Sequence, residues 1–141
     1  MAMFTTPVTG AVIGCAIRIH KSLGPGLLES AYEFCLAHEL RKQGLSYESQ
    51  VPLPLVYDGV TLPCVYRADF IVEDMLLLEL KVLERIMPVH HAQVLTYVRL
   101  AHVRQALLIN FNVPILKYGI KSFLGSTGAE GTGGVEDREQ Q

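Results

Sequence analysis

The sequence has few charged residues and few cysteines. Charged residues make up 18% of the 141 residues, against about 25% in typical soluble domains. With 12 basic and 14 acidic residues the formal net charge is −2, which argues against a strongly basic nucleic-acid binder. The three cysteines are widely spaced and form no CxxC pair. We therefore expect no disulfide framework, and a cytoplasmic location.

The N-terminal stretch lacks charge as well. Residues 2–17 carry no charged side chain, but they include three threonines, Pro7 and two glycines. The stretch is too short to span a membrane and lacks the basic beginning of a signal peptide. We expect no membrane segment, and a helix that starts at Pro7 instead.

The C-terminal residues 125–141 differ in composition from the rest of the chain. They hold four acidic residues, one basic residue and five glycines, with almost no large apolar side chain. Such a segment buries too little surface to offset its ordering entropy, so we expect a disordered tail. Residues 1–124 then form a single domain with a net charge of +1.

The pattern of apolar residues and breakers predicts an α/β domain with a mixed sheet and helices packed on it. Pro52 and Pro54 favour an edge position for the first strand, and Asp58-Gly59 predicts a hairpin turn. The expected order is α-α-β-β-β-α-β-β, with helices at residues 7–22, 27–43 and 88–102 and strands at 46–57, 60–72, 75–83, 105–110 and 115–121.

The third predicted strand carries the first candidate functional residues. Side chains at i and i+2 share a face of a strand, so Glu79 and Lys81 point the same way from an otherwise apolar segment. One interpretation is a simple ion pair at a strand end. The other is a binding site, because a buried charge is costly unless it is paired or binds something.

Asp69 on the preceding strand favours the second interpretation if the register is right. A three-residue turn at residues 73–75 places Asp69 opposite Glu79 and Arg67 opposite Lys81, whereas a two-residue turn places the two carboxylates on opposite faces. Two facing carboxylates repel unless a cation lies between them. This arrangement suits Mg²⁺, with Lys81 beside the metal to act on a water or to stabilise phosphate charge.

Asp69, followed after nine residues by Glu79-Leu80-Lys81, resembles the PD-(D/E)xK motif of restriction-endonuclease-like nucleases. Residues 26–32, GLLESAY, match the GxxExxY signature of a family of small bacterial proteins in that superfamily. Gln93-Val94-Leu95-Thr96-Tyr97 is similar to the QxxxY element of RecB-type exonucleases. The resemblance covers about residues 8–123, and its one departure is Ala68 where the superfamily motif has proline.

The resemblance implies a restriction-endonuclease-like fold and a nuclease that hydrolyses DNA or RNA with Mg²⁺ or Mn²⁺. It implies that Asp69, Glu79, the Leu80 carbonyl and Glu29 bind metal, and that Lys81 assists the attacking water. The alternative is a catalytically inactive nuclease-like fold that binds nucleic acid or protein. A homodimer would enlarge the substrate surface under either hypothesis, and the sequence leaves it open.

The outer residues of the implied site each have a structural alternative. The alternative role of Glu29 is to stabilise the first turn of its own helix. Gln93 and Tyr97 share a helix face that would position substrate or simply face solvent. The remaining implied substrate-binding residues, each of which also suits a packing or surface role, are Tyr32, Arg67 and His20.

Overall fold

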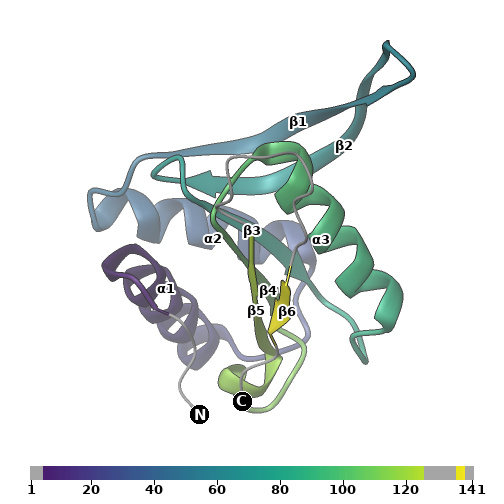
Figure 1. Ribbon diagram of the computed structural model, residues 1–141. Helices are drawn as coiled ribbons and strands as arrows, with labels where there is room; N and C mark the ends of the chain where they lie inside the picture. Colours follow the sequence, from purple (N-terminus) through teal and green to yellow (C-terminus); the bar gives the residue numbers. More distant parts are fainter. Residues whose placement is uncertain (1–4, 126–135, 139–141) are drawn as a thin grey trace.

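A six-stranded mixed sheet lies between two helical layers (Figure 1). The computed structural model describes residues 5–125 and 136–138, without the side chains of residues 64, 65 and 136–138. The elements are α1 (Pro7–Leu23), α2 (Glu29–Lys42), β1 (Tyr47–Tyr57), β2 (Val60–Val72), β3 (Leu76–Lys81), α3 (Pro88–Ala101), β4 (Gln105–Asn110), the 3₁₀ helix η1 (Leu116–Gly119), β5 (Ile120–Leu124) and β6 (Glu136–Arg138).

The strands follow one another across the sheet in chain order, from β1 to β6. Only β3 and β4 pair in parallel among the described strands, and α3 forms the crossover between them; the other neighbours are antiparallel. This confirms the predicted mixed sheet. β1 lies at an edge, where Pro52 and Pro54 lack ladder donors at little cost.

Helix α1 begins as the sequence predicts. Pro7 occupies the first turn, and the Thr6 hydroxyl accepts a hydrogen bond from the backbone N–H of Thr9 at 3.1 Å. Gly24 follows the helix with a φ of +70°, a conformation that glycine adopts without steric penalty. Capping at both ends fixes where the chain turns toward α2.

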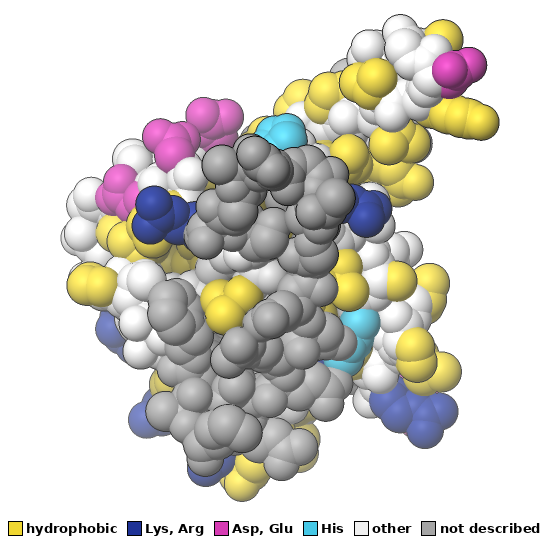
Figure 2. Space-filling model, in the orientation of Figure 1, with side chains coloured by type: hydrophobic (Ala, Val, Ile, Leu, Met, Phe, Trp, Pro, Cys, Tyr) yellow, Lys and Arg dark blue, Asp and Glu magenta, His cyan; other side chains and the backbone are white. Residues whose placement is uncertain are grey.

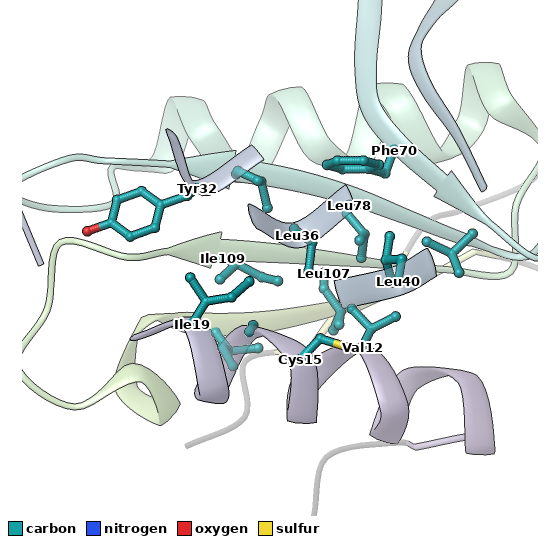
Figure 3. Packing of buried hydrophobic residues seen from close by; sticks show 14 of the residues in the cluster. Val12, Cys15, Ile19, Tyr32, Leu36, Leu40, Phe70, Leu78, Leu107 and Ile109 are labelled. Carbon is teal, nitrogen blue, oxygen red and sulfur yellow. The ribbon is translucent and has the colours of Figure 1, made fainter. Parts of the chain in front are cut away.

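The larger core lies between the sheet and the α1–α2 layer (Figure 3). Helices α1 and α2 pack their apolar stripes against side chains of β2, β3 and β4, so that one sheet face is closed to water. The labelled residues of this cluster are Val12, Cys15, Ile19, Tyr32, Leu36, Leu40, Phe70, Leu78, Leu107 and Ile109.

The smaller core lies on the opposite face, under α3. Leu77 of β3 and Leu108 of β4 pack there against Val94 and Val98 of the helix. Leu76 and Leu78 belong to the other core. β3 is therefore apolar on both faces, as the sequence predicts for a central strand.

The segment around residue 115 differs from the prediction. A strand at residues 115–121 is wrong, because Leu116–Gly119 form a 3₁₀ turn and the strand runs over Ile120–Leu124. The turn buries Leu116 against the larger core. It also brings Gly119 against β4, where a Cβ would lie 2.2 Å from the Asn110 carbonyl oxygen. Only glycine permits this approach.

The C-terminal tail falls largely outside the described residues. Glu136–Arg138, within the segment predicted to be disordered, pair with β5 as strand β6. Cys15 and Cys35 are free thiols. Among the helices of residues 5–125, none has both the length and the apolar character to cross a bilayer.

The β1–β2 hairpin extends beyond the rest of the domain (Figures 1 and 2). Asp58 and Gly59 turn it with φ values of +50° and +74°, as expected for a tight hairpin of this dipeptide. Hydrophobic side chains line this arm in Figure 2, and Val56, Tyr57 and Val60 are each more than 60% exposed.

Candidate active site

The turn between β2 and β3 sets the register of the site. Val72 pairs with Leu76, Ile71 with Leu77 and Phe70 with Leu78, so three residues form the turn. Glu73 and Asp74 in this turn have φ values of +52° and +55°. The predicted three-residue turn is thereby confirmed. In this register Asp69 and Glu79 are the next two residues to face each other.

The backbone ladder between β2 and β3 stops at this pair, and side chains continue the contact. The Asp69 N–H donates to Oε1 of Glu79 at 3.1 Å, and the Leu80 N–H donates to Oδ2 of Asp69 at 2.7 Å. Each carboxylate thus occupies the position of a backbone acceptor. The expected pairing of Arg67 with Lys81 is wrong, because the backbone pairing of β2 with β3 ends at Phe70 and Leu78.

In both strands of the β1–β2 hairpin, the side chains that face one core at one end of the strand face the other core further along. Phe70 and Val72 of β2 pack in the core under α1 and α2, whereas Ala68 packs in the core under α3. β1 changes in the same way, from Tyr47 in the first core to Leu53 in the second. Asp69 therefore lies where the ribbon crosses from one helical layer to the other.

Glu79 is the most deeply buried acidic residue of the site, with 5% of its surface exposed. Burial raises the pKa of its carboxyl, and the neighbouring Asp69 charge raises it further. Lys81 and the Asp69 N–H lower it, but the result is a pKa of about 8. Burial and the neighbouring Asp69 carboxylate together thus outweigh the effect of Lys81, which favours the ionised form of Glu79.

Asp69 is affected by the same causes to a smaller degree. Burial raises its pKa to about 6, against the lowering effect of the Leu80 N–H. The charges of Glu29 and Glu33 on α2 also raise it, and Lys81 lowers it. Two acidic residues of α2 therefore act on the Asp69 carboxylate.

Lys81 provides the positive charge beside the two carboxylates. Its Nζ lies 3.6 Å from Oε2 of Glu79, and 24% of its side chain is exposed. The Lys81 carbonyl accepts a hydrogen bond from the Phe111 N–H at 3.0 Å. The ammonium is thus held at the site while part of it faces solvent.

Asn110 anchors the chain that leaves the site after Lys81. This side chain is buried at the end of β4. Its Oδ1 accepts from the Leu83 N–H at 3.0 Å, and its Nδ2 donates to the Leu83 carbonyl at 2.9 Å. These bonds replace a strand pairing, which explains why β3 ends at Lys81 and not at the predicted residue 83.

Two residues join the site that the sequence analysis did not single out. Gln50 of β1 donates from Nε2 to Oε1 of Glu33 at 2.5 Å and, more distantly, to Oδ1 of Asp69 at 3.5 Å. Glu33 follows Glu29 by four residues and so shares its helix face, which is a signal the sequence contains. Gln50 has no comparable signal.

Helix α3 contributes Tyr97 from the opposite side. The side chain is partly buried, and its ring lies 5.8 Å from that of Tyr66. Burial raises the pKa of its hydroxyl, and the charges of Glu79 and Asp69 raise it further. Gln93, one turn earlier, is exposed. Tyr97 is thus close enough to interact with the carboxylates.

Tyr32 has the contacts of a packing residue. Its ring stacks on Phe111 at 4.3 Å between centroids. Its hydroxyl donates to the Gly24 carbonyl at 2.5 Å and accepts from the Leu27 N–H at 3.3 Å. In Figure 3 the hydroxyl points out of the core. Tyr32 therefore fixes the loop that leads into α2 and to Glu29.

The last two predicted residues differ in burial. His20 is buried at the end of α1, where its Nε2 lies 2.7 Å from the Val113 carbonyl oxygen. Arg67 is exposed on β2. Their roles in substrate binding stay predictions.

The donor set fits a hard divalent cation. Asp69 and Glu79 offer carboxylate oxygens that repel each other, and Mg²⁺ commonly takes one or two protein carboxylates and keeps several waters. Among the described residues, no three His, Cys, Asp or Glu side chains already stand close enough together to form a complete metal cage. These residues therefore suit a metal site in which water and substrate supply the remaining ligands.

A comparison with protein-family models agrees with this geometry. The model of the PD-(D/E)XK nuclease superfamily matches residues 6–123. Searches of curated proteins and of solved structures found no significant match. The chain belongs to the PD-(D/E)XK nuclease superfamily, and its α/β sheet with flanking helices is a restriction-endonuclease-like fold.

Proposed function

We propose that the protein is a metal-dependent nuclease that hydrolyses phosphodiester bonds in DNA or RNA. The observation that carries this proposal is the divergence of β2 from β3, which places Asp69, Glu79 and Lys81 together. Membership of a nuclease superfamily supports this reaction class. The carboxylates explain why a cation would be drawn to this point of the sheet, and the bound cation together with Lys81 would then attract a phosphate.

Asp69, Glu79 and the Leu80 carbonyl would hold Mg²⁺ or Mn²⁺, with Glu29 in support. Such a cation, when bound, polarises a phosphoryl oxygen and lowers the pKa of a water. Lys81 would orient the attacking water and stabilise charge that develops on the phosphate. Tyr97 and Gln93 on α3 would contact the nucleic-acid backbone.

A non-catalytic nuclease-like fold is the competing hypothesis. The ion pair between Lys81 and Glu79 at 3.6 Å is the observation that favours it, since a lysine can balance a buried carboxylate without any metal. The two hypotheses differ in metal binding. A binding module needs no cation at Asp69 and Glu79, whereas the nuclease does.

The test is hydrolysis of single- and double-stranded DNA and RNA with Mg²⁺ or Mn²⁺. We expect cleavage by the unaltered protein and a loss of at least about 100-fold in Glu79→Gln and Lys81→Ala, the usual scale for removing a group that transfers or orients a proton. Glu48→Gln and Lys42→Ala change the same residue types at exposed positions, and should retain full activity.

Cleavage that survives both Glu79→Gln and Lys81→Ala would show that the activity arises elsewhere or from a contaminant. Absence of cleavage together with absence of Mn²⁺ binding in calorimetry would favour the binding module. Circular dichroism of each variant shows that a lost activity is not lost folding.

A further inference from the structure

Strand β1 contains a residue whose backbone conformation is unusual for a strand. Gln50 has a φ of +51°, although it lies between two regular pairs, Ser49 with Phe70 and Val51 with Ala68. The left-handed region is unfavourable for a side chain such as glutamine, whereas glycine adopts it freely. Something must compensate for this conformation.

The side chain of Gln50 provides that compensation and points to a role. It lies opposite Asp69, at the residue where the ribbon changes from one core to the other. Its Nε2 donates to Glu33 at 2.5 Å and reaches toward Asp69 at 3.5 Å. One amide therefore connects β1 to α2 and to the carboxylate of β2.

The two oxygens of Asp69 have different partners. Oδ2 accepts from the Leu80 N–H of β3, and Oδ1 faces the Gln50 amide of β1. The carboxylate is thus oriented from both neighbouring strands. A neutral amide suits this task, because lysine or arginine at residue 50 would cancel the negative charge that attracts a cation.

We infer that Gln50 is a positioning residue of the metal site, and that its bridge to Glu33 orients the Asp69 carboxylate for a divalent cation. This inference rests on the proposed function. It also explains why a strained glutamine stands where glycine would be easier to accommodate. The amide, and not the backbone bend alone, is what the position needs.

The test uses the full chain, with Mn²⁺ binding measured by isothermal titration calorimetry and thermal unfolding measured in chelator. Gln50→Ala and Gln50→Gly both remove the amide, but only glycine relieves the backbone strain. We expect both variants to bind Mn²⁺ about tenfold more weakly, while Gln50→Gly unfolds at a higher temperature than Gln50→Ala. Gln43→Ala, an exposed glutamine, should leave the affinity unchanged.

The outcomes separate the two proposals. Mn²⁺ affinity equal to that of the unaltered protein in both variants would overturn the role of Gln50 and leave the proposed function intact. Affinity that is lost in Gln50→Ala but restored in Gln50→Gly would also overturn it, because only the backbone would then matter. Failure of the unaltered protein to bind Mn²⁺ would contradict the proposed function itself.

Discussion

The two halves of the β2–β3 pair are built from the same two strands but differ in chemistry. Next to the turn, Phe70 to Val72 pair with Leu76 to Leu78 through a regular backbone ladder, and their apolar side chains pack in the two cores. Beyond Phe70, the carboxylates of Asp69 and Glu79 take over as acceptors. One half stabilises the fold, and the other holds charge.

The difference shows how a sheet can form a site at a cost in stability. A backbone acceptor is neutral, whereas each inserted carboxylate has a raised pKa, about 8 for Glu79 and about 6 for Asp69. A raised carboxyl pKa means that the folded protein disfavours the charge it will need to bind metal. The half next to the turn, which we call the closed half, must supply stability that offsets the cost of the buried carboxylates in the other, open half.

The largest effect on stability is expected in the closed half. Leu78→Ala removes a fully buried side chain from the larger core and should lower the free energy of unfolding by about 2–5 kcal/mol. Chemical denaturation measures it. Leu62→Ala on the projecting hairpin, where the side chain is 39% exposed, is the matched control. A similar loss in both would mean that β3 is not central to the core.

A smaller and pH-dependent effect is expected in the open half. The pKa of Glu79 is about 8 in the folded protein against an ordinary value of 4.5 for a glutamate side chain, so the unfolded chain loses this proton first as pH rises. In chelator, stability should therefore fall between about pH 4.5 and pH 8, by at least about 1 kcal/mol.

Glu79→Gln should remove most of that decline, so that the variant is more stable than the unaltered protein at pH 8 and similar to it at pH 4. Denaturation curves across this range measure the difference. Glu48→Gln, at an exposed position, should follow the unaltered protein. An unchanged slope in Glu79→Gln would contradict a raised pKa at this residue.

The smallest effect distinguishes the two carboxylates from each other. Asp69→Asn keeps an oxygen that can accept from the Leu80 N–H but removes the charge that raises the pKa of Glu79. We expect a change in stability below about 1 kcal/mol, together with a lower pKa for Glu79. Carboxyl NMR titration measures the pKa, with Asp58→Asn as the control. An unchanged Glu79 pKa would show that burial alone raises it.

The sequence was sufficient for the parts of the fold that local patterns determine. The strands over Val60–Val72 and Gln105–Asn110 lie where alternation and turn residues predict them. The three-residue turn then determines that Asp69 and Glu79 lie opposite each other, because the register of a hairpin follows from the length of its turn. The central pair of the site was therefore within reach of sequence reasoning.

The remaining features depend on contacts between distant segments. The 3₁₀ turn at Leu116–Gly119 brings Gly119 close to Asn110, a contact between segments that no local sequence pattern reports. The end of the ladder after Phe70 depends on which way two side chains turn. Gln50 meets Glu33 only because β1 and α2 are brought together by the fold.

The most direct test of the central claim is a crystal structure of the protein grown at pH 8 with Mn²⁺, located by its anomalous scattering. The account predicts a metal ion with oxygens of both Asp69 and Glu79 within about 2.3 Å, the range for hard cations, and Lys81 beside it. A structure grown at saturating Mn²⁺ that has no metal at Asp69 and Glu79, and in which Lys81 and Glu79 stay paired, would contradict this account.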